Sequence, residues 1–280
     1  MQSKDVPVAV FLSPHFDDIA LSCGGMAARL SLSGAHCLCI TIFAAPAPGN
    51  EPLSEYAQRL HAEWQSGAGE ARQAINEVRR EEERQAMRLL GLQPVWLDLA
   101  DAPYRRSAAG EHFYTSDEEL FGRVALEERR ILVPRIAEEI RRVIKEHAPR
   151  GRVRVFAPLG AGKHVDHRLV FWAARSLGPR CGVLFYEDYP YAARVGALAA
   201  RLEELSLPAE PRLIAISDLI GVKIAAIARY KSQLGVLFGS SEAMPAAVRA
   251  YAQSVAVGLG GTQYGEKYWY IPPLYLISMP

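Results

Sequence analysis

Two segments of the sequence place histidine and aspartate at a spacing that suits metal binding. His15 and Asp18 are three residues apart, and so are His164 and His167, with Asp166 between the latter two. If each segment begins a helical turn, side chains three residues apart share a face, so either pair can converge on one ion. Imidazole nitrogens and a carboxylate oxygen suit zinc. The sequence therefore predicts a zinc site that draws on both segments.

The set His15, Asp18 and His167 gives three protein ligands, which leaves the fourth position that a catalytic zinc ion keeps for water. Asp17 then lies beside the metal without having to bind it, which suits a general base that takes a proton from zinc-bound water. A single segment of either kind is more often a turn or a helix cap. Their joint occurrence after two predicted strands favours the metal site.

Short apolar runs rich in β-branched residues alternate with longer segments of helical periodicity. This alternation predicts an α/β fold with a mostly parallel sheet. The predicted strands cover residues 8–12, 37–43, 95–99, 153–157 and 183–186. We expect a Rossmann-like sheet with its strands in an order like 3-2-1-4-5, flanked by helices, in a single domain over residues 1–280.

The predicted strands bring the two segments to one edge of the sheet. Strand 8–12 leads into SPHFDD and strand 153–157 leads into PLGAGKHVDHRLV. In open parallel sheets, ligands bind outside the carboxyl ends of the strands where the strand order reverses. The two polar clusters should therefore face one another across that edge.

Three further segments have helical character. Residues 79–90 predict a helix that ends at Gly91, and an apolar stripe runs through Ile136, Ile140, Val143 and Ile144. Residues 223–233 predict a core-packing helix at the rear of the sheet. Replacing Ser232 or Gln233 by Ala should then change stability little and activity less than about tenfold.

The composition limits the classes of partner. The 280 residues carry 32 basic and 31 acidic side chains, so no overall field attracts nucleic acid or an anionic membrane. The first apolar run is too short to span a membrane. The four cysteines lie in or beside apolar stretches, which predicts buried free thiols in a protein of a reducing compartment. We therefore expect a cytoplasmic protein with a small-molecule substrate, no nucleic-acid partner and no membrane insertion. Assembly into a homo-oligomer is left open.

The motifs resemble those of the PIG-L/LmbE-like family of zinc-dependent de-N-acetylases. The family's first motif, Ala-His-Pro-Asp-Asp-Glu followed by a Gly pair, corresponds to PHFDDI at 14–19 with Gly24 and Gly25, and its His-Pro-Asp-His corresponds to HVDH at 164–167. A helix beginning RREE at 79–82 and the stretch DLAD at 98–101 resemble two further family segments. The resemblance covers about residues 8–175 and, more faintly, YEDYPYA at 186–192 and residues 223–233.

The resemblance implies a role for each candidate residue and a substrate class. It implies removal of an N-acetyl group from a GlcNAc-like sugar or glycoside. The implied metal ligands are His15, Asp18 and His167; Asp17 is the general base; His164 stabilises the tetrahedral intermediate or protonates the leaving amine; Asp166 orients a histidine; Arg79 and Asp101 hold sugar hydroxyls.

The chain also departs from the family pattern. Phe16 and Val165 replace prolines of the two motifs, and Ile19 replaces the glutamate of the first. Some members place a tyrosine where this chain has Gly162. Oxyanion stabilisation would then depend on zinc and His164, with Lys163 or a backbone N–H as a further donor.

Other functions fit the same fold class less well. A dinucleotide-binding domain needs Gly-x-Gly-x-x-Gly directly after the first strand, where this chain has HFDD. A metal-dependent phosphoesterase normally needs more ligands than three, and the remaining histidines are isolated. A non-catalytic binding module on the same scaffold is the third alternative, and the intact Asp17 argues against it. Loops 44–70 and 100–116 should form the pocket rim, with Trp64, Tyr104, Arg105 and Tyr114 available to a substrate.

Overall fold

A seven-stranded sheet runs through the middle of the protein. The computed structural model describes residues 7–48, 52–64, 72–257, 259–260 and 263–273. The strand order is β3-β2-β1-β4-β5-β7-β6. The strands are β1 (Val8–Ser13), β2 (His36–Thr41), β3 (Gln93–Trp96), β4 (Val153–Pro158), β5 (Cys181–Tyr186), β6 (Glu210–Ala215) and β7 (Gly265–Tyr270). The predicted fold class and the order 3-2-1-4-5 are confirmed.

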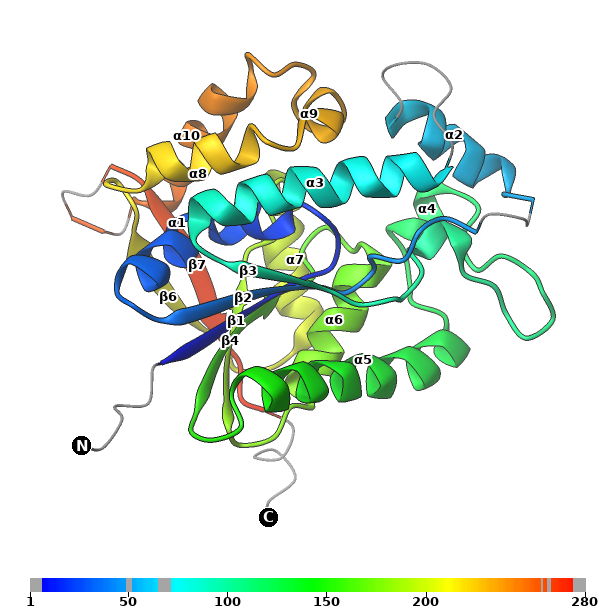
Figure 1. Cartoon of the computed structure of the whole chain (residues 1–280), viewed down its shortest axis with the longest axis horizontal. Helices are drawn as coiled ribbons and strands as arrows, with labels where there is room; N and C mark the ends of the chain where they lie inside the picture. The colour runs from blue at the N-terminus through cyan, green and yellow to red at the C-terminus, as the bar shows by residue number, and fades with distance from the viewer. Residues whose placement is uncertain (1–6, 49–51, 65–71, 258, 261–262, 274–280) are drawn as a thin grey trace.

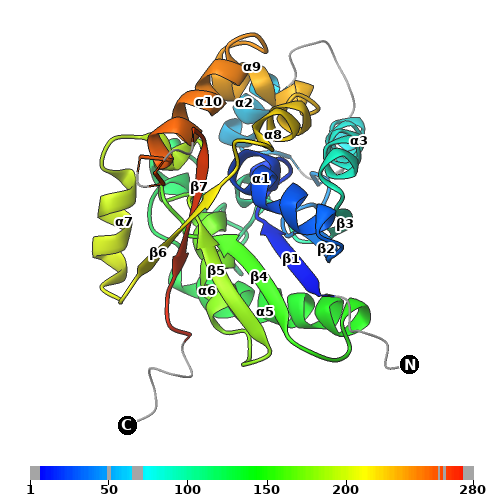
Figure 2. The same ribbon diagram turned by 90° about the vertical axis from the view of Figure 1, so that its left-hand side faces the viewer.

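The first five strands run parallel to one another, whereas β7 pairs antiparallel with both β5 and β6. Figure 2 shows β6 and β7 extending the sheet beyond β5. Neither of these strands is predicted from the sequence. Their residues, EPRLIA and GEKYWY, lack both a continuous apolar run and a clean alternation of apolar and polar positions.

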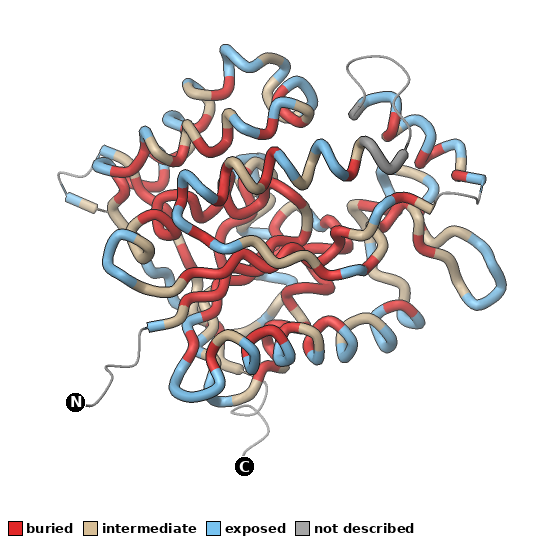
Figure 3. Tube along the Cα trace, in the orientation of Figure 1, coloured by how far each residue is buried: buried red, intermediate tan, exposed pale blue. Residues whose placement is uncertain are grey.

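Helices cover both faces of the sheet, which explains why β1 is apolar at nearly every position. Phe11 of β1 packs in one buried cluster with residues of α1 (Asp18–Leu32) and α3 (Arg72–Leu90). Val10 and Leu12 pack in a second cluster with α5 (Leu126–His147) and α6 (Val165–Arg175). In Figure 1, α3 lies above the sheet and α5 below it, and Figure 3 shows the buried residues concentrated between these layers. Strands buried on both faces are typical of parallel sheets.

The described residues also form further helices. They are α2 (Glu55–Trp64), η1 (Ala102–Tyr104), α4 (Asp117–Leu120), η2 (Tyr191–Ala193), α7 (Ala197–Leu205), α8 (Ile220–Ile227), α9 (Lys231–Phe238) and α10 (Met244–Val255). Within the described ranges, no helix combines the length and apolar composition needed to cross a membrane.

The prediction of one helix over residues 223–233, at the rear of the sheet, is wrong in two respects. The segment forms two helices, α8 and α9, because Tyr230 adopts φ −83° and ψ 59° and interrupts the helical backbone. Helix α8 packs on α1 and α3 instead of on the sheet, so it belongs to an outer layer (Figure 1).

The cysteines fit the prediction of core thiols. All four are free; Cys23, Cys37 and Cys39 are buried and Cys181 is half-buried. Burial raises the pKa of the Cys37 thiol to about 11, so this thiol stays protonated and unreactive at neutral pH.

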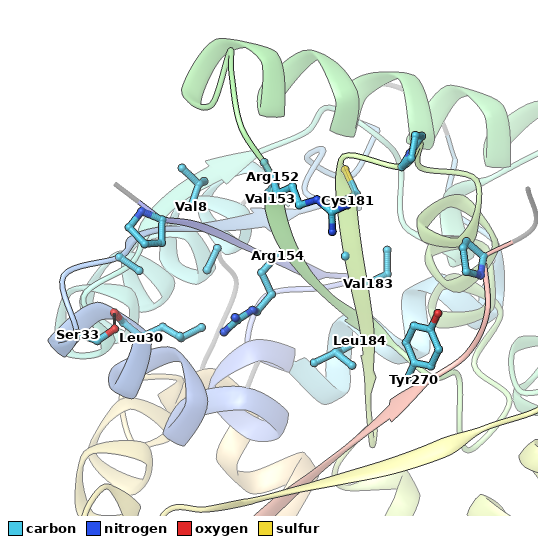
Figure 4. A pocket seen from close by; sticks show the side chains of 16 residues that line it. Val8, Leu30, Ser33, Arg152, Val153, Arg154, Cys181, Val183, Leu184 and Tyr270 are labelled. Carbon is cyan, nitrogen blue, oxygen red and sulfur yellow. Dashed lines mark hydrogen bonds between the residues drawn. The ribbon is translucent and has the colours of Figure 1, made fainter. Parts of the chain in front are cut away.

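A large cavity lies at the amino ends of the strands. It encloses about 770 Å³ and is lined by the first residues of three strands, Val8, Val153 and Cys181. Figure 4 shows Arg154 and Leu184 along its wall, and none of the motif residues contributes to it. The histidines and aspartates of the two motifs therefore lie at the opposite end of the sheet from this cavity.

Candidate active site

The carboxyl ends of β1 and β4 bring the two motifs into one cavity of about 300 Å³. β1 ends at Ser13 and delivers His15, while a loop after β4 delivers His164 as the residue that caps α6. The imidazole centroid of His15 lies 4.8 Å from that of His164 and 5.5 Å from that of His167. Segments about 150 positions apart in the sequence thus form one histidine cluster, as the strand-edge argument predicts.

The Asp18 carboxylate lies between two of these histidines. One of its oxygens is 3.6 Å from His15 Nδ1, and the other is 3.5 Å from His167 Nε2. Two ligand atoms on a tetrahedral zinc ion lie about 3.4 Å apart, given bond lengths of about 2.1 Å. Among the described residues, the buried Nε2 of His167 has no hydrogen-bond partner. An unpaired imidazole nitrogen beside a carboxylate fits a cation at this place.

Two other groups of side chains also converge. One ligand atom each from His15, His164 and His167 lie within 4.8 Å of one another, and the same holds for His15, Asp101 and Asp166. Geometry alone therefore allows more than one ligand set around His15. The Asp18 carboxylate lies close to both His15 and His167 at the same edge of the sheet, so it is a further candidate ligand.

In both His15 and His167, a buried carboxylate contacts the ring nitrogen that does not face Asp18. Asp166 Oδ2 lies 3.0 Å from His15 Nε2, and Asp188 Oδ1 lies 2.7 Å from His167 Nδ1. Carboxylates of this kind fix the ring orientation and tautomer of a metal-binding histidine and raise its basicity. The resemblance implies the orienting role for Asp166.

Asp188 has no assigned role in the sequence analysis. Its second oxygen accepts hydrogen bonds from the backbone N–H groups of Gly160 and Ala161 at 2.8 and 2.9 Å. It follows β5 at the same edge of the sheet as the two motifs. The pair Glu187-Asp188 directly after a predicted strand is the sequence signal that could have identified it.

The electrostatics of the cluster favour binding of a cation. Burial lowers the pKa of His15, but Asp101, Asp166 and Asp18 together outweigh burial and raise it well above its usual value. Burial also lowers the pKa of His167, and Asp18 and Asp188 more than compensate. Positive charge is therefore stabilised here, whether a proton or a metal ion carries it.

The Asp17 side chain borders the cavity without being engaged elsewhere. Within the described ranges, its carboxylate makes no hydrogen bond, and only 8% of the residue is exposed. Burial and the neighbouring Asp18 charge raise the pKa of Asp17 well above its usual range. Its backbone adopts φ 93°, a strained conformation for a residue other than glycine. Strain of this kind is typical of residues held in place for function.

His164 is a neutral imidazole with a defined tautomer. Its Nδ1 accepts a hydrogen bond from the backbone N–H of Asp166 at 3.2 Å, which places the proton on Nε2. Burial and the nearby His15 lower its pKa well below the usual value. His164 therefore offers an N–H donor to the cavity that it lines.

Arg79 and Asp101, which the resemblance assigns to sugar binding, both line this cavity. The Arg79 guanidinium lies 5.2 Å from the centroid of the Phe16 ring. Asp101 Oδ1 accepts from the backbone N–H of Ala102 at 2.7 Å and lies 3.5 Å from His15 Nε2. Both side chains are thus close to the histidine cluster.

Two residues predicted at the rim are structural instead. Arg105 is 8% exposed and forms ion pairs with Glu128 and Asp166, each at 2.5 Å. Tyr114 is buried and donates a hydrogen bond to Glu128. Their polar groups are needed to satisfy buried charges, so they are not available to a substrate. The side chain of Trp64 lies outside the described residues.

Helix α9 reaches the cavity, contrary to the prediction for its sequence. Gln233, Val236 and Leu237 line the same cavity as His15 and Asp17. The break at Tyr230 separates α9 from α8 and lets it follow a different course. Gln233 therefore has a place at the site that the helical pattern alone does not indicate.

Several known proteins with similar sequences and structures are named as deacetylases. The 2'-N-acetylparomamine deacetylase of Niallia circulans is 31% identical over 244 residues, which cover 85% of this chain and 84% of that protein. The protein of the same name from Streptomyces fradiae is 37% identical over 193 residues, or 68% of this chain and 59% of the relative. A crystal structure of the zinc-inhibited form of teicoplanin deacetylase is 26% identical, with a TM-score of 0.75 and coverage of 94% of this chain and 97% of that one.

A family assignment follows from the motif-bearing part of the chain. Residues 10–177 match the PIG-L family, described as GlcNAc-PI de-N-acetylase, and this match includes both histidine motifs. Since the match extends over more than half of the 280 residues, the chain belongs to the PIG-L family.

Proposed function

We propose that this protein is a hydrolase that removes the N-acetyl group from an amino sugar or from a glycoside that carries one. The observation that carries the proposal is the convergence of His15, Asp18 and His167 beside the unengaged carboxylate of Asp17. The named deacetylases among its relatives act in the same reaction class.

In this proposal, His15, Asp18 and His167 hold a divalent metal ion, which we take to be zinc. Two imidazoles and a carboxylate suit zinc, and the unpaired Nε2 of His167 is accounted for as a ligand atom. The bound ion would polarise the amide carbonyl and lower the pKa of a water molecule. Asp166 and Asp188 orient the two histidines from behind.

Asp17 is assigned the proton transfer and His164 a hydrogen bond. Asp17 accepts a proton from the attacking water and passes it to the departing amine nitrogen. His164, a neutral imidazole with its proton on Nε2, donates a hydrogen bond toward the carbonyl oxygen.

The sugar is held by residues that line the cavity around these groups. Arg79 and Asp101 are placed to bind its hydroxyl groups, and the Phe16 ring under Arg79 limits the positions that the guanidinium can take. A cavity of about 300 Å³ accommodates a monosaccharide, and a larger glycoside would extend out of it. We expect the protein to act on a small molecule in the cytoplasm, where its free thiols would stay reduced.

Acetate release from a panel of N-acetylated amino sugars and glycosides tests the proposal. The purified protein should contain one zinc ion per chain and release acetate from at least one panel member. Two metal ions per chain, with phosphate release from p-nitrophenyl phosphate and no acetate from the panel, would instead identify a phosphoesterase. One metal ion with no turnover of either kind would identify a binding module.

A further inference from the structure

A tyrosine outside the two histidine motifs lies against the histidine cluster. Tyr191 begins the short helix η2 after β5 and lines the same cavity as His15 and His164. Its ring meets that of His167 edge to face, with centroids 5.5 Å apart, and the Phe121 ring packs 5.6 Å away on another side. The phenol is therefore held in a defined place next to the proposed metal ligands.

Tyr191 fills the space that a side chain at position 162 would need. A Cβ atom added to Gly162 would lie only 2.4 Å from Tyr191 Cβ and 2.9 Å from its Cγ. Gly162 also has φ 84°, a conformation that residues with side chains rarely adopt. A side chain at 162 and the observed position of Tyr191 exclude one another. Lys163, the other donor considered for this loop, is exposed and does not line the cavity.

The Tyr191 hydroxyl is free to serve a substrate. Within the part of the chain that the structure describes, the Tyr191 side chain makes ring contacts with Phe121, His164 and His167 and no hydrogen bond. A phenol O–H keeps its proton at neutral pH and acts as a hydrogen-bond donor.

Asp188 fixes the position of Tyr191 relative to the site. Its carboxylate binds His167 and the backbone of Gly160 and Ala161, while its carbonyl oxygen accepts from the Ala192 N–H at 2.8 Å. The histidine, the loop before position 162 and helix η2 are thus tied to one residue. A donor anchored in this way costs little reorganisation when charge develops nearby.

We propose that Tyr191 is a catalytic residue that donates a hydrogen bond to the carbonyl oxygen of the scissile amide in the transition state. The inference rests on the proposed deacetylation. The water oxygen forms a bond to the carbonyl carbon, the π electron pair moves to the carbonyl oxygen, and the Tyr191 O–H stabilises that negative charge without losing its proton. Asp17 takes up the proton that the water loses. The C=O bond then re-forms, the C–N bond breaks, and Asp17 delivers this proton to the amine nitrogen.

The variant Tyr191→Phe removes the hydroxyl and keeps the ring packing. Loss of one oxyanion donor should lower kcat roughly 10²-fold, with KM changed by less than about threefold. Zinc content and melting temperature should match the wild type. A phosphonate analogue of the tetrahedral intermediate should bind more weakly in proportion to kcat/KM, whereas the affinity for the deacetylated product should not change.

Tyr189→Phe is the matched control. Tyr189 lies two positions earlier, stacks on Tyr251 at 4.6 Å and does not line the active-site cavity. It should keep wild-type kcat. A Tyr191→Phe enzyme with kcat within about threefold of the wild type, or one that loses substrate and analogue affinity equally, overturns the assignment. A wild type that releases no acetate from any panel member contradicts the proposed function itself, and the inference with it.

Discussion

The Nδ1 atom of His167 lies 2.7 Å from the Oδ1 atom of Asp188, and both side chains are almost completely buried. A neutral imidazole that donates from Nδ1 to a carboxylate presents the lone pair of Nε2 on its other side. This is the nitrogen that lies 3.5 Å from Asp18 and lacks a hydrogen-bond partner among the described residues. One hydrogen bond thus sets the direction in which His167 can bind a metal.

Asp188→Asn should weaken metal binding without changing any proposed ligand. Loss of the carboxylate charge leaves His167 less basic and free to turn, which typically lowers metal affinity 10- to 100-fold. Competition with a chromogenic chelator measures the change. Glu187→Gln is the control, because this neighbouring buried carboxylate bonds to Tyr251 and Trp269, away from the site. Equal zinc affinity in Asp188→Asn and the wild type would contradict the role of the pair.

Asp18→Asn and His164→Ala distinguish the two ligand sets that geometry allows around His15 and His167. If Asp18 is a ligand and His164 is a donor to substrate, Asp18→Asn loses zinc and His164→Ala keeps it while kcat falls. Zinc per chain, measured by atomic emission after gel filtration, decides between them. Zinc loss confined to His164→Ala would show that the three histidines form the site.

Gly162→Ala should lower both stability and activity. The added methyl group would lie 2.4 Å from Tyr191 Cβ, and overpacking of this kind costs about 1–3 kcal/mol in free energy of unfolding, in addition to the cost of its positive φ. Gly34→Ala isolates the backbone cost, because Gly34 has φ 85° and no atom within 4 Å of the added Cβ. Urea unfolding and kcat should both change more in Gly162→Ala than in Gly34→Ala. Equal changes in the two variants would mean that Tyr191 can shift to accommodate the methyl group without loss of stability or activity.

Glu83 should make the wild type lose stability as pH rises from about 4.5 to 7. Its buried carboxyl accepts hydrogen bonds from Thr41 and Trp96, yet burial raises its pKa from 4.5 to about 7. In this window the folded state binds more protons than the unfolded state, so the free energy of unfolding falls with increasing pH. Between pH 4.5 and pH 8, the change amounts to about 3 kcal/mol at most.

Glu83→Gln keeps the side-chain shape and removes the titration. Urea unfolding at pH 4.5 and pH 8 should show that the variant gains on the wild type at the higher pH. Glu77→Gln, an exposed position of the same helix, should show no such gain. A stability difference between Glu83→Gln and the wild type that is the same at both pH values would contradict the shifted pKa.

The sequence predicts those site residues that lie close together along the chain. Asp17, Asp18 and His15 lie within one segment after an apolar strand, and His164 and His167 within another, so spacing and strand position suffice to group them. The parallel direction of the strands then follows from the alternation of strands and helices. These features depend on patterns within about 20 residues.

The features that the sequence did not predict depend on contacts between distant segments. Asp188 and Tyr191 meet the motifs only after β5 pairs with β4, and no spacing rule connects them to His167. β7 carries Glu266, whose buried carboxylate binds the Lys223 ammonium at 2.7 Å and the backbone N–H of Gly25. A buried charged residue therefore keeps β7 from being identified by hydrophobic periodicity.

The most direct test of the proposed mechanism measures zinc stoichiometry and acetate release on one preparation of Asp17→Asn. The amide keeps the shape of the side chain but cannot accept a proton, and Asp17 is not among the proposed ligands. We predict one zinc ion per chain, as in the wild type, and turnover lowered by roughly 10²- to 10⁴-fold, the range expected for loss of a general base. Full zinc content with undiminished turnover would contradict the mechanism, because another group would then have to accept the proton.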